Sequence, residues 1–141
     1  MQGFEPWQDA LIAEVKVARL ATVSPGGQPH VVPACFAHSG GAFWIPVDEK
    51  PKRSTRLARL RNIESEPRVS LLFDRYDDDW TKLGWVRVDG LAAVLPRGDQ
   101  AAEALAALRV RYPQYGAMAL ESLPMIRIDP VSVSGWRWPE P

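Results

Sequence analysis

The sequence predicts an α+β domain in which six antiparallel strands form a barrel with helices on its outside. Two apolar, β-branched runs at 29–38 and 42–47 are bounded by glycine-containing turns at 24–27 and 38–41, a pattern typical of meandering antiparallel strands. Helix-like segments separate these strands from the later ones, and a meander of this kind commonly hides its edges by closing into a barrel. No linker or internal repeat divides the chain, so we expect residues 1–141 to form one domain.

The first half of the chain begins with an expected amphipathic helix over residues 5–18. Its apolar residues Leu11, Ile12 and Val15 recur at helical spacing, with charged residues on the other face. Three strands are then expected at 19–23, 29–38 and 42–47.

The second half alternates helices and strands. Helices are expected at 54–66, which ends before Pro67, and from Asp99 as N-cap through about Arg111. Strands are expected at 68–73, 83–95 and 125–133. Gly90 indicates a bulge or bend, and Pro130 requires a strand edge or a bulge because it has no backbone N–H.

The composition excludes several classes of partner. The chain has 17 Lys and Arg against 17 Asp and Glu, so no net charge attracts it to nucleic acid or to an anionic membrane. The N-terminal residues lack the pattern of a signal peptide, and no apolar run approaches the roughly 20 residues of a membrane helix. A single cysteine, Cys35, allows no intrachain disulfide. We therefore expect a cytoplasmic protein without nucleic-acid or membrane partners.

A basic segment is the strongest local signal for binding. Six of the twelve residues at 50–61 are Lys or Arg, and they lie where a strand ends and a helix begins. A helix N-terminus with adjacent cations binds phosphate or carboxylate groups. Lys50, Lys52 and Arg53 precede the first turn and are the best candidates. The alternative is a solvated basic face of the helix.

Other reactive side chains favour no catalytic site. The acidic run at 74–79 lacks the spacing of a calcium loop, so a solvated loop is the preferred interpretation. His30 and His38 are interpreted as surface or structural, and Cys35 as a buried, inert thiol. Dinucleotide-binding, phosphate-loop, nucleophile-elbow and zinc-protease motifs are absent. Redox chemistry fits such a chain, since there the cofactor performs the difficult step.

The chain contains six tryptophans, an unusual number for a small barrel. Four of them lie in its second half: Trp80, Trp85, Trp136 and Trp138. Because a small core cannot enclose so many large rings, we expect some of them to face a ligand or a second subunit.

Several segments resemble one known family in their order and spacing. Residues 19–23 and 27–33 resemble the opening hairpin of the pyridoxamine-phosphate-oxidase-like, FMN-binding split-barrel family. Residues 60–63, 67–71 and 79–90 are similar to its deazaflavin-using branch, the flavin/deazaflavin oxidoreductases of group B. The resemblance covers the chain from about Asp9 to Trp138.

This resemblance implies a split-barrel homodimer with two cofactor sites at the subunit interface, each holding the deazaflavin coenzyme F420 or, alternatively, FMN. The implied cofactor-binding residues are Val32 and Pro33 along the ring; Lys50, Lys52 and Arg53 at the phosphate, with Arg59 and Asn62 nearby; and Trp80, Lys82, Trp85 and Arg87 at the cofactor tail or the neighbouring subunit's site.

The function that the resemblance implies is hydride transfer between a deazaflavin and a small organic acceptor. No side chain is expected to act as a dedicated catalyst, and no metal is expected. Two alternatives remain open: an FMN-dependent oxidoreductase of the same family, and a cofactor-carrying or haem-binding module without turnover.

Overall fold

The computed structural model describes residues 3–47 and 55–138 of the chain. Its helices are α1 (Pro6–Glu14), α2 (Thr55–Ser65) and α3 (Ala102–Arg111), with short 3-10 turns η1 (Trp80–Lys82), η2 (Gly98–Ala101), η3 (Pro113–Ala117) and η4 (Leu120–Ser122). Its strands are β1 (Ala18–Val23), β2 (Pro29–Ala34), β3 (Ala37–Ser39), β4 (Ala42–Pro46), β5 (Arg68–Arg75), β6 (Gly84–Leu95) and β7 (Met125–Arg137). The expected α+β class is confirmed.

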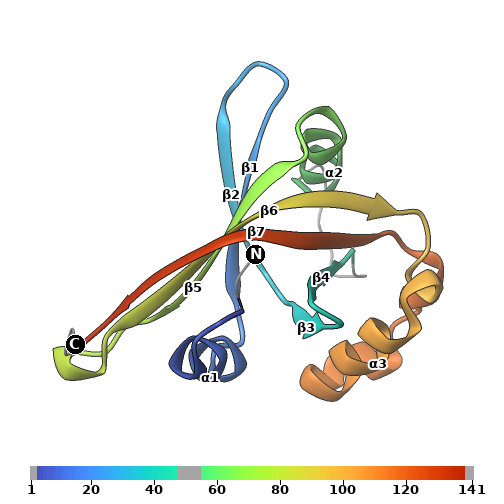
Figure 1. Ribbon diagram of the computed structural model, residues 1–141. Helices are drawn as coiled ribbons and strands as arrows, with labels where there is room; N and C mark the ends of the chain where they lie inside the picture. The colour runs from blue at the N-terminus through green and yellow to red at the C-terminus, as the bar shows by residue number, and fades with distance from the viewer. Residues whose placement is uncertain (1–2, 48–54, 139–141) are drawn as a thin grey trace.

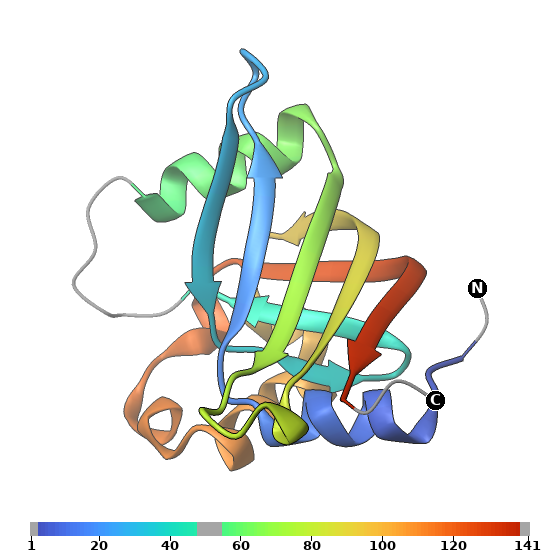
Figure 2. The same cartoon turned by 90° about the vertical axis from the view of Figure 1, so that its left-hand side faces the viewer.

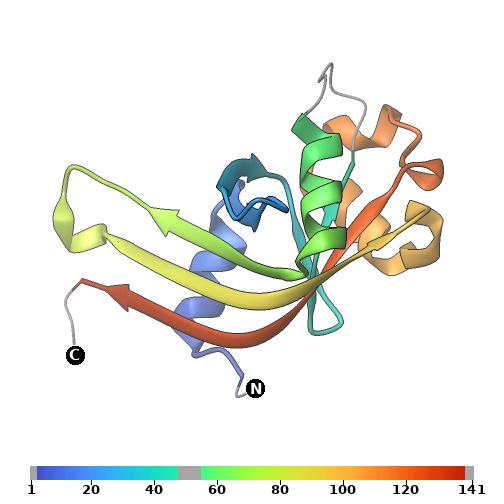
Figure 3. The same ribbon diagram turned by 90° about the horizontal axis from the view of Figure 1, so that it is seen from above.

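The described strands form one antiparallel sheet in the order β2-β1-β5-β6-β7-β4-β3. β2 and β3 are the two edges of this sheet, although only Cys35 and Phe36 separate them along the chain. The sheet must therefore curl until its edges approach each other, and Figures 1 and 3 show this curl in β5, β6 and β7. The barrel-like architecture was predicted correctly, but the number of strands was not, because the expected strand at 29–38 is two strands.

A tyrosine from a distant part of the chain lies at the break between β2 and β3. The Phe36 N–H donates to the Tyr112 hydroxyl over 2.9 Å, and that hydroxyl lies within hydrogen-bond distance of the carbonyls of Phe36 and Lys16. These bonds satisfy backbone groups that would otherwise pair in a sheet. The chain can therefore leave one edge of the sheet and enter the other at this point.

A β-bulge lies in the middle of the long β6–β7 ladder, as Gly90 and Pro130 predicted. Asp89 pairs with Ser132 and Gly90 pairs with Pro130, so Val131 is the additional residue on β7. A Cβ atom on Gly90 would lie 2.6 Å from the carbonyl oxygen of Asp129. Glycine is therefore required here by the close approach of the two backbones.

Two apolar clusters hold these elements together. The larger one fills the curled sheet, with Phe36, Phe43 and Phe73 among its fully buried side chains, and α1 contributes Leu11 and Ile12. The second cluster lies under α3 and contains Leu105, Leu108, Tyr112 and Met125, among others. Together the two clusters fix α1 and α3 against the sheet.

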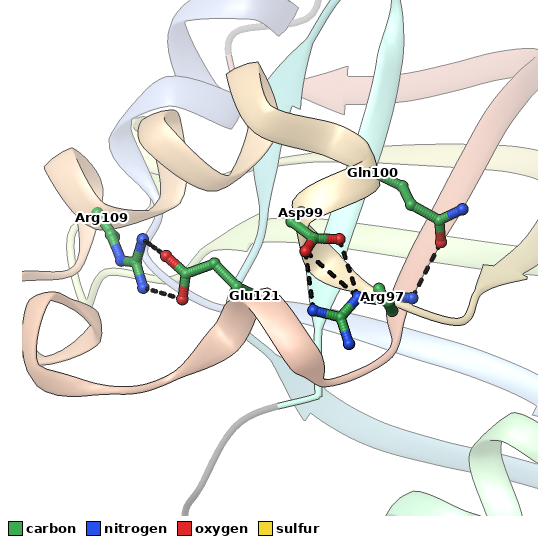
Figure 4. Close-up of polar contacts among 5 residues, drawn as sticks. All are labelled: Arg97, Asp99, Gln100, Arg109 and Glu121. Atoms are coloured by element: carbon green, nitrogen blue, oxygen red, sulfur yellow. Dashed lines mark hydrogen bonds and ion pairs between the residues drawn. The ribbon is translucent and has the colours of Figure 1, made fainter.

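The helices are short and close to the expected positions. The helix expected at 54–66 is α2, and the opening helix ends at Glu14, before Ala18. Asp99 was expected to cap the helix before Arg111, but it lies inside η2, where its carboxylate pairs with Arg97 (Figure 4). Among the described residues, no helix combines the length and the apolar character needed to cross a membrane.

Candidate functional site

Strand register separates the expected cofactor residues onto two faces of the sheet. Directly paired residues share a face. Val32 pairs with Leu20, whose side chain is fully buried, so Val32 faces the core. Pro33 pairs with Arg19 on β1. Arg19 pairs with Leu72 on β5, and Leu72 pairs with Arg87 on β6, so this row of residues lies on the opposite face. We call this second face of β2, β1, β5 and β6 the outer face.

Helix α2 covers the inner side near β1 and carries two buried polar side chains. Arg59 and Asn62 are each 5% exposed, and the Asn62 side-chain amide donates to the Thr22 hydroxyl on β1 over 3.0 Å. Thr22 is buried as well, so three of the four buried polar side chains in the described part of the chain gather here; the fourth is Gln8. Buried polar side chains are uncommon in proteins and are usually hydrogen-bonded. A group of three such side chains in one place is therefore a candidate ligand site.

The three residues expected at the phosphate lie outside the described residues. Lys50, Lys52 and Arg53 immediately precede Thr55, where α2 begins. Arg59 and Asn62 are three positions apart on α2 and therefore share one side of this helix. The two described residues of the expected phosphate group therefore lie next to each other on α2.

The outer face carries an apolar groove of about 630 Å³. Its lining comes from β1, β2, β5, β6, β7 and the residue after α2: Ala21, Thr22, Val23, Pro29, Glu66, Arg68, Val69, Ser70, Asp89, Gly90, Leu91 and Val131. A groove of this volume is within the range that accommodates a small molecule. Figure 2 looks onto this side of the sheet, with α2 behind the strands.

Polar groups are few in the groove and are mutually bonded. The Ser70 hydroxyl donates to the Asp89 carboxylate over 2.6 Å, and Arg87 lies 3.3 Å from the same carboxylate. At the rim, Arg68 donates two hydrogen bonds to Glu66 and lowers the pKa of that carboxyl to about 2. Glu66 is therefore ionised at neutral pH.

None of the expected cofactor residues lines this groove. Pro33, Trp85 and Arg87 share its face, and Arg87 contacts it only through Asp89. Sequence analysis missed the groove because Ser70 and Asp89 alternate with apolar residues, which is the pattern of any half-exposed strand. The one available signal was Gly90, since its bulge adds Val131 to the lining.

The remaining expected residues lie away from α2. Trp80 and Lys82 are exposed on η1, at the end of the β5–β6 hairpin, and Figures 1 and 3 place this end far from α2. Trp85 is half-buried and pairs with Trp136. Within the described residues, the expected tail residues of η1 therefore do not lie beside Arg59 and Asn62 on α2.

The reactive side chains interpreted as structural show no catalytic arrangement. The His38 ring stacks on Phe43 at 4.2 Å, and burial lowers the pKa of its imidazole, against the opposing charge of Asp9. Asp79 caps η1 by accepting from Thr81. The described residues contain no group of three or more side chains placed to hold a metal ion. The arrangement is suited to binding and orienting a ligand.

Comparison with known proteins places this geometry in a family. The model of the family described as pyridoxamine 5'-phosphate oxidase matches residues 4–137. No curated protein matches the chain. HutZ, a heme storage protein from Vibrio cholerae, is a similar solved structure, with a TM-score of 0.73, 21% identity, and coverage of 96% of this chain and 95% of HutZ.

Two further solved structures are similar at comparable identity. The conserved hypothetical protein Rv2991 from Mycobacterium tuberculosis has a TM-score of 0.74 and 21% identity, with 97% of this chain and 86% of that protein covered. An F420 reductase has a TM-score of 0.67 and 23% identity, with 93% of this chain and 98% of the reductase covered. These likenesses establish the fold. The family model covers nearly the whole chain, and the chain therefore belongs to the pyridoxamine 5'-phosphate oxidase family.

Proposed function

We propose that this protein is an F420-dependent oxidoreductase that transfers a hydride between the deazaflavin and a small organic acceptor, acting as a cytoplasmic homodimer. The observation that carries the proposal is the buried polar cluster under α2. Arg59 and Asn62 are almost fully buried there. In the sequence they follow the basic residues Lys50, Lys52 and Arg53. A cofactor with a phosphate and carboxylates would use both groups of residues.

The residues present fit such an anion. Arg59 is a permanently charged guanidinium with a planar set of donors that matches phosphate and carboxylate groups. Asn62, held by Thr22, presents an amide next to it. Lys52 and Arg53 would bind the phosphate, while Arg59 and Asn62 would fix its distance from β2. Val32, which faces the same side of β2 as this cluster, would then lie along the ring, whereas Pro33 faces the outer side.

The outer face supports the homodimer. Val31, Leu91 and Val131 are 63%, 48% and 55% exposed on it, which is unusual for large apolar side chains clustered around one groove. A second copy covering this face would bury them and enclose the groove. Trp80 and Lys82, which lie far from α2 within one chain, would then contribute to the partner's site, together with Trp85 and Arg87 on the outer face.

When bound, a reduced deazaflavin would supply a hydride, and the acceptor would take up a proton from solvent to complete a two-electron reduction. The protein's part would be to hold the ring and the acceptor in contact and to exclude water. No described side chain needs to act as an acid or a base.

An FMN-dependent oxidoreductase is the second candidate, supported by the family description and by a FAD-binding protein from Mesorhizobium loti among the similar structures, at 25% identity. A haem-binding module is the third candidate, supported by a heme storage protein and a heme-binding protein among the similar structures.

Tryptophan-fluorescence titration with F420, FMN and haem tests the proposal, because several tryptophans would lie near the site. We expect F420 to quench the fluorescence at micromolar concentration and FMN to bind more weakly. Preference for FMN would replace the first candidate by the second, and a Soret band with haem alone would support the module without turnover. The Lys52→Ala/Arg53→Ala variant should weaken binding by about 1–3 kcal/mol per lost contact. Arg97→Ala, remote on η2, is the matched control.

A further inference from the structure

His30 on β2 has a buried ring nitrogen without a hydrogen-bond partner. The residue as a whole is half-buried, but its Nδ1 atom is inaccessible to solvent and bonds to no described residue. A polar atom that is buried without a partner loses its hydration without compensation, so such an atom in a folded protein requires an explanation. The sequence alone indicated only a surface or structural histidine.

The neighbours of His30 are the residues of the buried polar cluster. His30 pairs directly with Thr22, which accepts the hydrogen bond of Asn62. Val32 lies two positions along the same strand and faces the same side of the sheet. His30 therefore lies on the side covered by α2, near Val32 and Asn62, two of the residues expected to contact the cofactor.

We propose that His30 binds an oxygen atom of the cofactor through Nδ1–H, beside Asn62 and Arg59. This inference rests on the proposed function, because it takes the α2 cluster as the cofactor site. A neutral imidazole with its proton on Nδ1 donates one hydrogen bond, and both the phosphate and the ring carbonyls of a flavin or deazaflavin offer oxygen acceptors. The bond would satisfy the buried nitrogen and fix the cofactor relative to β2.

Nitrogen-15 NMR of the two imidazoles tests this contact without any turnover. The chain contains only two histidines, so His38, which stacks on Phe43, serves as the internal control. We expect F420 or FMN to shift the Nδ1 resonance of His30 and to leave His38 unchanged. If inorganic phosphate alone reproduces the shift, the acceptor is the phosphate; if only the complete cofactors do, it is a ring oxygen.

Substitutions distinguish a contact through Nδ1 from a general packing role. The amide of asparagine can occupy the position of Nδ1, whereas the amide of glutamine reaches the position of Nε2. His30→Asn should keep cofactor affinity within about threefold, while His30→Gln and His30→Leu should lose about tenfold. His38→Gln should bind as the wild type does. Thermal melting of each variant shows whether it is folded.

The outcomes separate the two proposals. If fluorescence reports cofactor binding while the His30 resonance stays in place, the inference about His30 is wrong and the proposed function stands. Equal affinity in His30→Asn and His30→Leu would also overturn it. If neither F420 nor FMN binds, the proposed function fails and the contact fails with it.

Discussion

The hydrogen bond between Asn62 and Thr22 is the residue-scale feature on which the candidate site depends. Both side chains are buried, and the 3.0 Å bond joins α2 to β1. Removing only one partner leaves the other unsatisfied in an apolar environment, which costs more than the bond contributes.

Thr22→Val should therefore destabilise the protein. Valine has nearly the same shape but no acceptor, so the Asn62 amide loses its partner, and we expect the free energy of unfolding to fall by about 1–3 kcal/mol. Urea denaturation followed by circular dichroism measures this. Ser122→Ala, at an exposed position on η4, should change stability by less than about 0.5 kcal/mol. Equal stability of the Thr22→Val variant and the wild type would show that the amide finds another partner.

Gly90 cannot be substituted by a larger residue without disturbing the bulge. In Gly90→Ala the new methyl group would lie 2.6 Å from the Asp129 carbonyl oxygen, so the two strands must separate. Overpacking of this kind costs about 1–3 kcal/mol, and the melting temperature should fall accordingly. Gly116→Ala is the control, because nothing lies within 4 Å of its Cβ position. A wild-type melting temperature for Gly90→Ala would contradict a rigid bulge.

At the scale of elements, Arg109 fixes α3 to the segment that follows it. Its guanidinium donates to Glu121 on η4 over 2.6 and 2.9 Å, and to the carbonyls of Tyr115 and Met118 (Figure 4 shows the Glu121 pair). The hydrogen bond from Arg109 lowers the pKa of Glu121 to about 2. One side chain thus organises two 3-10 turns that have no regular pairing of their own.

This ion pair predicts a definite dependence of stability on pH. Because the pKa of Glu121 is lower in the folded protein than its ordinary value of 4.5, the pair stabilises the fold fully above about pH 4.5 and loses this effect as the pH falls towards 2. Glu121→Gln should be less stable than the wild type at pH 7, and the difference should shrink through that window. Urea denaturation at several pH values measures it, and a constant difference between pH 7 and pH 2 would refute the role of this carboxylate.

Most elements were predictable from local pattern, and the exceptions depend on distant contacts. The strand at 68–75 and helix α2 follow from apolar spacing that their own residues contain. The break of 29–38 into β2 and β3 does not, because it depends on the hydroxyl of Tyr112, which is 76 residues from Phe36. Similarly, the resemblance pointed to Asn62, whereas the groove around Ser70 and Asp89 exists only once five strands are assembled.

At the scale of the whole molecule, none of the described helices covers the outer face. The described helices lie against other parts of the sheet: α2 on its inner side, α1 at one end and α3 under the second apolar cluster (Figures 1 and 2). Val31, Leu91 and Val131 therefore remain exposed around the groove. Covering this face with a second copy, as in the proposed dimer, would remove these apolar side chains from solvent.

Sedimentation velocity should accordingly report a dimer for the wild type. Val31→Lys places a charge on the outer face, at a residue that is neither part of the groove lining nor part of the core. It should shift the equilibrium towards the monomer, and the monomer should still unfold cooperatively in a thermal melt. Val110→Lys is the matched control: Val110 is 84% exposed on α3, away from this face, and its variant should remain dimeric. If Val31→Lys dissociates the dimer and weakens F420 binding together, the two sites are shared between subunits. If the Val31→Lys variant dimerises as tightly as the wild type, the interface lies elsewhere. If the wild type itself is a monomer, no site is shared between subunits.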